Sequence, residues 1–318
     1  MKRMTLVDKI YGKEAITSPI LIELIKSNPI QRLKKINQFG IPNKYYHKKN
    51  YSRYDHSVGV FILLKKLGAS EEEQIAGLLH DTSHTAFSHV YDWVIGSGAT
   101  EDAQDKIHEK FIASNLKEVF KKHNLNLKKI ANYENFKFLE RNVPMLCADR
   151  LDYGFREMSL KSAKICFQDL TVKDKRIVFK TKRSAVIFAQ AFLNNQIKHW
   201  GGLEAVSRYE ILSTALKIAL KEKIINKNDF WSTDEDLLKK INKAGNKEIR
   251  RLLKILTNKS LKSFPRSNWV KHKKFRYVDP DFLNGQKIFK LSKADKDFQL
   301  RVKLAEKENK KGIFPVKF

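Results

Sequence analysis

The sequence lacks a long apolar run, and it has few cysteines. Its longest apolar stretch near the N-terminus is VGVFILL, residues 58–64, far shorter than the roughly 20 residues of a membrane-spanning helix. The first residues, MKRMTLVDKIYGKEA, contain no apolar core of a secretory signal. Cys147 and Cys166 form no CxxC pair and are expected to be reduced thiols. These absences predict a cytoplasmic protein with no membrane partner.

Acidic residues are also in short supply. The chain has 63 Lys and Arg against 35 Asp and Glu, a formal net charge of +28. Such an excess favours polyanionic partners, either nucleic acid or phosphorylated small molecules. The alternative is a lysine-rich composition without functional meaning, because the lysines are spread along the whole chain.

The chain has no internal repeat and no Gly/Ser-rich linker, so its length fits one large domain with a smaller appendage. We place the main domain at 1–261, with a core at about 30–160, and a less regular basic tail subdomain at 262–318. Helical apolar spacing dominates. The expected helices are 18–36, 56–68, 70–79, 101–122, 136–160, 184–225 with a break near Gly201-Gly202, and 232–241. Residues 163–172 and 176–180 indicate a small β-hairpin.

The stretch HDTSHTAFSH, residues 80–89, is dense in groups that bind metals or carry protons. His80 and Asp81 follow a helix that Ser70 and Glu73 open with a capping-box pattern. Together with His56 and Asp149 they offer imidazole and carboxylate ligands from separate helices. Such ligands suit one divalent ion, Mn, Fe, Mg or Zn. A His-Asp dipeptide alone would more simply be a satisfied surface pair.

Several motifs resemble those of the HD-domain phosphohydrolases, specifically the deoxynucleoside triphosphate triphosphohydrolase-like branch. RYDHSVGV (53–60) is similar to that family's R-[FY]-x-H-S-x-G-V segment, and HDTSHTAFSH to its H-D-x-x-H-x-x-F-S-H segment. IHEKF (107–111), DRLDYGFRE (149–157) and the lead-in PIQRLKKINQFG (29–40) match in the same order. The resemblance implies a mostly α fold, an HD-domain helical bundle.

The resemblance implies a role for each motif residue. The metal ligands would be His56, His80, Asp81 and Asp149. His84 and His108 would face the scissile phosphate, although His84 could instead be a further metal ligand. His89 would protonate the leaving oxygen, and Asp92 would orient it. Residues three apart on a helix are neighbours, and a carboxylate beside an imidazole favours the charged form that a general acid needs.

The resemblance also implies a nucleotide substrate and a homo-oligomeric enzyme. Gln38 and Glu157 would hold the sugar 3′-hydroxyl, and Phe39 and Tyr153 would pack on the sugar unless they are ordinary core residues. Arg53 and Arg150 would meet phosphates, whose geometry suits the guanidinium fork. The expected reaction is metal-dependent hydrolysis of dNTPs to deoxynucleoside and tripolyphosphate.

One departure from the family concerns the residues that grip the triphosphate. The stretch FLNNQIKHWGG (192–202) has Lys198 and His199 but lacks the family's Tyr and Arg. The triphosphate-binding residues are therefore missing, or other lysines take their place. Without them, the same groups could act as a nucleotidase, a nuclease or a phosphodiesterase.

The segment 249–278 supports a different class of function. It has ten Lys and Arg, no Asp or Glu, and interleaved aromatic residues. Basic charge beside aromatic faces is typical of single-strand binding, so a nucleic-acid-binding protein is the alternative. The plainer interpretation is a solvated basic face whose aromatic residues pack on the main domain.

Overall fold

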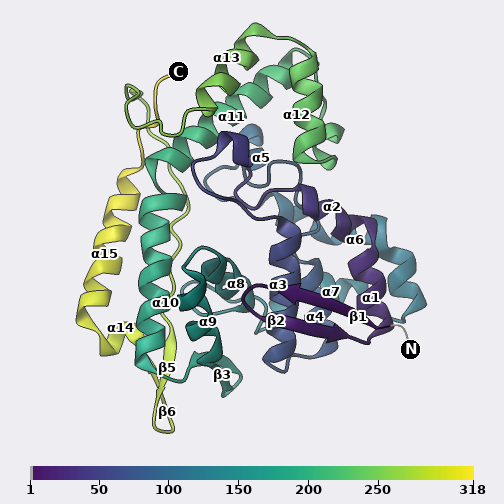
Figure 1. Ribbon diagram of the computed structural model, residues 1–318, viewed down its shortest axis with the longest axis vertical. Helices are drawn as coiled ribbons and strands as arrows, with labels where there is room; N and C mark the ends of the chain where they lie inside the picture. The colour runs from purple at the N-terminus through teal and green to yellow at the C-terminus, as the bar shows by residue number, and fades with distance from the viewer. Residues whose placement is uncertain (1–2) are drawn as a thin grey trace.

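A computed structural model describes residues 3–318, which form a mostly helical fold with two small sheets (Figure 1). This confirms the fold class. The α-helices are α1 Pro19–Lys26, α2 Asn28–Arg32, α3 Arg53–Lys66, α4 Glu71–Leu79, α5 Val90–Ile95, α6 Ala103–Lys122, α7 Leu127–Ala131, α8 Ala148–Arg156, α9 Leu160–Gln168, α10 Lys182–Asn195, α11 Leu203–Lys221, α12 Asp234–Lys243, α13 Lys247–Leu256, α14 Leu291–Ala294 and α15 Lys296–Lys311. The strands are β1 Met4–Asp8, β2 Gly12–Ile16, β3 Leu170–Lys173, β4 Arg176–Phe179, β5 Asp281–Asn284 and β6 Lys287–Lys290.

Helix α3 lies at the centre of the half of the molecule that carries the histidines. It begins three residues earlier than the apolar pattern predicts, because Ser52 and Asp55 form a capping box in which each side chain bonds the other's backbone N–H. Every residue from His56 to Leu64 is buried, and α3 packs against α4 and α8. It therefore carries His56 in the core and not on the surface.

Helix α4 begins at Ser70 as predicted, with the Ser70 hydroxyl accepting the Glu73 N–H. Glu73 does not complete a capping box. Its carboxylate instead accepts the backbone N–H groups of Phe138 at 2.7 Å and Leu139 at 3.0 Å. The predicted helix over 136–160 is wrong for 136–147, which forms turns and no α-helix. Only α8 occupies that range before α9 begins.

The long helical pattern over 184–225 is confirmed, together with its break. Helix α10 ends in a π-helical turn, Gln196–Trp200, and α11 starts after Gly202. Widened turns of this kind are often found at functional sites. Here the turn places His199 and Trp200 within hydrogen-bonding distance of Glu157.

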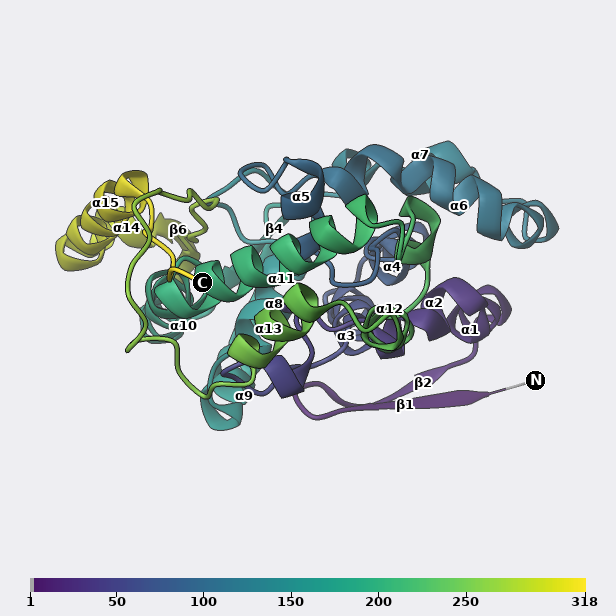
Figure 2. The ribbon, with the colours of Figure 1, turned by 90° about the horizontal axis from the view of Figure 1, so that it is seen from above.

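The β structure is more extensive than the sequence indicates. The predicted hairpin exists as β3 and β4, but residues 163–168 belong to α9. Strand β5 of the tail pairs in parallel with β4, which gives the strand order β3-β4-β5-β6, and α15 follows beyond it. The hairpin β1–β2 was not predicted. In Figure 2 it runs along the lower edge of the molecule, below α1 and α3. The division at 261/262 stays a prediction.

Among the described residues, no helix is long and apolar enough to cross a membrane.

Gly59 on α3 has no side chain, and the space beside it is filled by two charged side chains of α8, Asp152 and Arg156. A Cβ atom there would lie 2.1 Å from both Arg156 Nη2 and Asp152 Oδ1. We predict that Gly59→Ala destabilises the fold by about 1–3 kcal/mol through overpacking. Helix propensity alone predicts the opposite sign, a gain of about 1 kcal/mol. Urea unfolding midpoints distinguish the two, with the exposed helical variant Lys117→Ala as control.

Candidate active site

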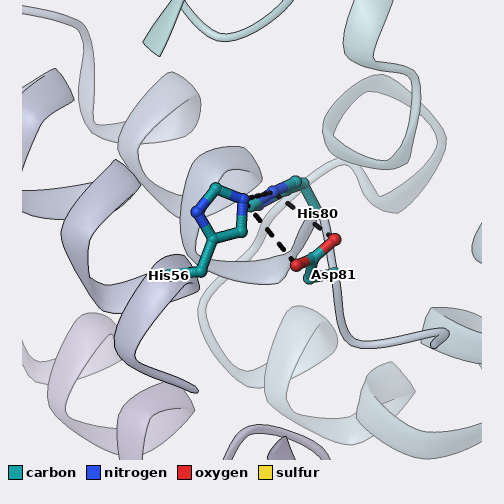
Figure 3. Close-up of side chains that lie close together, drawn as sticks. All are labelled: His56, His80 and Asp81. Carbon is teal, nitrogen blue, oxygen red and sulfur yellow. Dashed lines mark hydrogen bonds and ion pairs between the residues drawn. The ribbon is translucent and has the colours of Figure 1, made fainter. Parts of the chain in front are cut away.

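Three side chains from different parts of the chain lie close together (Figure 3), and all three line one cleft. His56 comes from α3, His80 from the end of α4, and Asp81 from the loop that follows. The His56 and His80 Nε2 atoms are 3.2 Å apart, and Asp81 oxygens lie 3.8 Å from the first and 3.6 Å from the second. One ligand atom from each lies within 4.8 Å of the others, so the group could hold a metal ion.

Asp149, at the start of α8, completes the predicted ligand set. Its Oδ1 atom is 2.9 Å from His56 Nε2 and 3.6 Å from His80 Nε2. Hydrogen bonds from these imidazoles outweigh burial and hold the pKa of the Asp149 carboxyl well below its usual range. The structure thus brings together all of the residues predicted as metal ligands.

The outer nitrogens of the two imidazoles are already occupied. His56 Nδ1 is 2.7 Å from Asp152 Oδ2, and His80 Nδ1 is 2.7 Å from the carbonyl oxygen of Gly77. Because these oxygens only accept hydrogen bonds, each Nδ1 must carry a proton, which leaves both Nε2 atoms to face inward. Two nitrogens bound to one ion at about 2.1 Å lie roughly 3 Å apart. The donor set and its outer contacts fit a divalent cation.

The charge around His56 shows how strongly this cluster attracts a cation. Burial lowers the pKa of His56, but its hydrogen bonds to Asp149 and Asp152 outweigh that effect and raise the pKa to about 9. Burial also lowers the pKa of His80, and the nearby Asp81 and Asp149 raise it above the ordinary value. A proton or a metal ion would satisfy the same carboxylates.

Asp152, which bonds the outer nitrogen of His56, is itself held by further hydrogen bonds. Its Oδ2 atom also accepts Nε of Arg156 at 2.7 Å, while Oδ1 accepts the Tyr11 hydroxyl at 2.8 Å. Arg156 reaches on to Asp8 at 2.8 Å. The N-terminal hairpin therefore supports the cluster through buried hydrogen bonds.

Arg53, predicted to contact phosphate, is buried and holds Asp81. Its Nη1 donates to Asp81 Oδ2 at 2.8 Å, and its Nε donates to Ser88 Oγ at 3.0 Å. The remaining oxygen, Asp81 Oδ1, lies 3.3 Å from His84 Nε2. Burial, followed by the Arg53 charge, lowers the pKa of His84 to about 3. His84 is therefore a neutral imidazole at the wall of the cleft.

His89 and Asp92 lie as the sequence predicts. His89 lines the cleft, and its Nδ1 is 3.2 Å from Asp92 Oδ2. The other Asp92 oxygen accepts the Ala103 N–H at 2.9 Å, which fixes the carboxylate. With Nδ1 bonded to Asp92, the His89 Nε2 atom is the one that can transfer a proton.

His108 does not line the cleft. Its Nδ1 contacts Ser83 Oγ at 2.8 Å, and its buried Nε2 has no hydrogen-bond partner among the described residues. Burial lowers the pKa of His108 to about 3. It stands behind Tyr133, whose ring centre lies 4.7 Å away and which itself lines the cleft.

The residues predicted to bind the sugar line the same cleft, which has a volume of about 310 Å³. Gln38 presents a buried Oε1 atom with no hydrogen-bond partner in the described part of the chain. Glu157 accepts His199 Nδ1 at 2.7 Å and Trp200 Nε1 at 2.8 Å, one bond to each oxygen. Phe39 packs edge-on against His199 with ring centres 4.6 Å apart.

Tyr153 and Arg150 complete the predicted set. The Tyr153 ring packs on Phe192 and Trp200, with centres 5.4 Å away in each case. Arg150 donates to Glu140 Oε1 at 2.6 Å and to Cys147 Sγ at 3.0 Å. Glu140, Cys147 and Asp149 could also hold an ion by spacing alone, but the Arg150 guanidinium already bonds two of them.

Sequence reasoning missed the cleft residues supplied by the tail. Lys273, Lys274 and Arg276 line the cleft together with Glu101, although they lie far from the motifs in sequence. The signal is the basic segment 249–278, for which the sequence predicts either nucleic-acid binding or a solvated face and no part in the cleft. Two of its other basic residues also form ion pairs: Lys271 with Glu210 at 3.0 Å, and Arg251 with Glu248 at 2.6 Å.

Comparisons with known proteins agree with this geometry. The HD domain family matches residues 53–168. The uncharacterized protein YdhJ of Bacillus subtilis is 34% identical over 321 residues, 98% of each chain. The metal-dependent phosphohydrolase cns2 of Cordyceps militaris is 28% identical, over 86% of this chain and 83% of that one.

Two further likenesses are shorter or more distant. Human deoxynucleoside triphosphate triphosphohydrolase SAMHD1 is 33% identical over 100 residues, 27% of this chain and 16% of its own. The crystal structure of a phosphohydrolase from Bacteroides thetaiotaomicron covers 96% of this chain and 98% of its own, with a TM-score of 0.73 and 19% identity, which shows a shared fold. With a family match across the metal cluster and a full-length relative, the chain belongs to the HD-domain phosphohydrolase superfamily.

Proposed function

We propose that the protein hydrolyses deoxynucleoside triphosphates to deoxynucleoside and tripolyphosphate with one divalent cation. The observation that carries this proposal is one shared cleft. It is lined both by His56, His80 and Asp81, which could hold a metal ion, and by Gln38, whose buried Oε1 accepts no hydrogen bond from the described residues. A hydroxyl-bearing ligand would fill that acceptor, since buried polar atoms are rarely left unpaired. The likeness of a 100-residue region to SAMHD1 supports a nucleotide substrate.

His56, His80, Asp81 and Asp149 would hold the cation. When bound, a divalent cation supplies charge that polarises a phosphoryl oxygen and lowers the pKa of water. Nitrogen and oxygen donors of this kind accept Mn, Fe, Mg or Zn. Arg53 keeps Asp81 in place, and it retains unused N–H donors for a phosphate oxygen, because a guanidinium has five.

The proton for the leaving 5′-oxygen would come from His89. Its Nδ1 is held by Asp92, which leaves Nε2 as the nitrogen available to a ligand in the cleft that His89 lines. His84, held neutral, has its single N–H at Nε2 facing Asp81 Oδ1, so it would donate to a phosphate oxygen only in exchange for that contact. His108 would act only after a movement that brings it to the cleft. Gln38 and Glu157 would bind the sugar hydroxyl between the Phe39 and Tyr153 rings.

Removing the charge behind His56 should weaken metal binding without touching a ligand. Asp152→Asn keeps the shape but loses the carboxylate that His56 Nδ1 contacts. We expect affinity for Mn²⁺ to fall about 10- to 100-fold in calorimetric titration. Asp102→Asn, which alters a carboxylate paired with Lys106 outside the cluster, is the matched control. Equal affinities in a folded Asp152→Asn protein would contradict the proposed ligand set.

A product assay tests the reaction itself. Each dNTP and rNTP is incubated with Mn²⁺, Mg²⁺ or Fe²⁺, and the products are separated by chromatography. We expect deoxynucleoside and tripolyphosphate from dNTPs, lost in Asp81→Asn and retained in Asp297→Asn, an exposed carboxylate on α15. Release of inorganic phosphate from a mononucleotide, or cleavage of an oligonucleotide, with intact dNTPs would identify a nucleotidase or nuclease instead.

The acid role of His89 has its own signature. His89→Gln should slow dNTP hydrolysis by about 10²–10⁴-fold, since proton donation to a poor leaving group is lost. p-Nitrophenyl triphosphate carries p-nitrophenolate in the place of the 5′-oxygen, and this leaving group needs no proton, so its hydrolysis should fall far less. Equal losses with both substrates would assign His89 to phosphate binding.

A further inference from the structure

The tail crosses the cleft as a strap, residues 271–278, between α13 and β5, and descends beside α10 in Figure 1. Main-chain contacts fix it. The Arg276 N–H donates to Gln196 Oε1 at 3.1 Å, and the Lys273 carbonyl accepts Asn309 Nδ2 at 3.0 Å. The strap is thus held by the π-helical turn after α10 and by α15.

Lys273 carries a buried charge that is poorly satisfied. Its side chain is 6% exposed, and its Nζ lies 3.4 Å from Glu101 Oε1 and 3.9 Å from the centre of the Tyr209 ring. Glu101 Oε1 is nevertheless without a hydrogen bond of good geometry, and no hydrogen bond from this ammonium is present in residues 3–318. An ammonium has three donors, so Lys273, which lines the cleft, retains donors for an anion that enters it.

Glu101 serves both cations of the strap. Its Oε2 atom bonds the Arg276 guanidinium, and its side chain is 1% exposed. One carboxylate between two cations leaves a net positive charge facing the cleft, and Lys274 adds another. The loop that carries Glu101 also bonds Asp92 through Ala103, so this charge lies beside the His89 end of the cleft.

We propose that Lys273 and Arg276 form the binding site for the polyphosphate tail of the substrate, which Glu101 occupies until the tail displaces it. The inference rests on the proposed function in taking the anion as a nucleoside triphosphate tail. An ammonium beside a guanidinium fork suits successive phosphate groups. The strap would supply cations in place of the family's Arg, which the stretch 192–202 lacks.

The test is calorimetric binding of inorganic tripolyphosphate to the full chain at constant ionic strength. Lys273→Met, which keeps the side-chain volume, should weaken binding about tenfold or more, the worth of a charged hydrogen bond. Glu101→Gln should tighten binding several-fold, because it removes the competing carboxylate. Lys262→Met, an exposed lysine of the same basic segment outside the cleft, should bind as the wild type does.

The two variants should change tripolyphosphate affinity in opposite directions, which distinguishes a ligand site from a structural ion pair. If Glu101→Gln weakens binding as much as Lys273→Met, or if Lys262→Met matches Lys273→Met, the proposal is overturned. Should Lys273→Met fail to fold, the double variant Glu101→Gln/Lys273→Met removes both charges together and must still bind less tightly than Glu101→Gln. A single-stranded oligonucleotide that outcompetes tripolyphosphate, and loses the same affinity in Lys273→Met, would overturn the assignment to a polyphosphate tail.

Kinetics distinguish this inference from the proposed function. If dNTPs are not hydrolysed but the tripolyphosphate affinities shift as expected, the proposed reaction fails and the anion site stands. If dNTPs are hydrolysed with an unchanged KM in folded Lys273→Met, the reaction stands and the anion site fails.

Discussion

The geometry of the site depends on the buried carboxylate of Asp152. It accepts hydrogen bonds from His56, Arg156 and Tyr11, so it ties α3, α8 and the N-terminal hairpin to one point. A buried charge is tolerable only when it is paired and fully hydrogen-bonded, and here each oxygen is satisfied. Because the third element is the hairpin β1–β2, a feature remote from the cleft determines how His56 faces it.

A second buried carboxylate, that of Asp234, holds the backbone of the loop 80–89. Asp234, at the start of α12, accepts the backbone N–H groups of Phe87 at 2.7 Å and Asn37 at 2.8 Å. Phe87 and Ser88 both adopt positive φ, 63° and 45°, a conformation that ordinary residues keep only when their surroundings enforce it. The histidines of this loop are therefore held by the fold around them, and the site is largely preorganised.

The local part of this design could be predicted from the sequence. The Ser70 helix cap and the placement of His80 at a helix end follow from patterns within a few residues. The hairpin β1–β2 is also local, with its own ladder and a turn held by Asp8, but its docking on Asp152 is not. The turns of 136–147 bond Glu73, a contact distant in sequence that no local pattern shows. Lys273 and Arg276 could not be predicted as cleft residues for the same reason, because their partner Glu101 lies more than 170 residues away in sequence.

The charge of the cleft explains why metal and anion binding should be coupled. With the histidines counted as neutral, its walls hold six carboxylates and five cations: Asp81, Glu101, Asp105, Glu140, Asp149 and Glu157 against Arg53, Arg150, Lys273, Lys274 and Arg276. Despite the +28 charge of the chain, this balance is slightly negative. The pKa of His56 is raised to about 9, so in the metal-free cleft its imidazolium offsets this one excess negative charge near neutral pH. A divalent cation that replaces the proton of His56 adds one further positive charge, which attracts phosphates. Each ligand should therefore raise the affinity for the other.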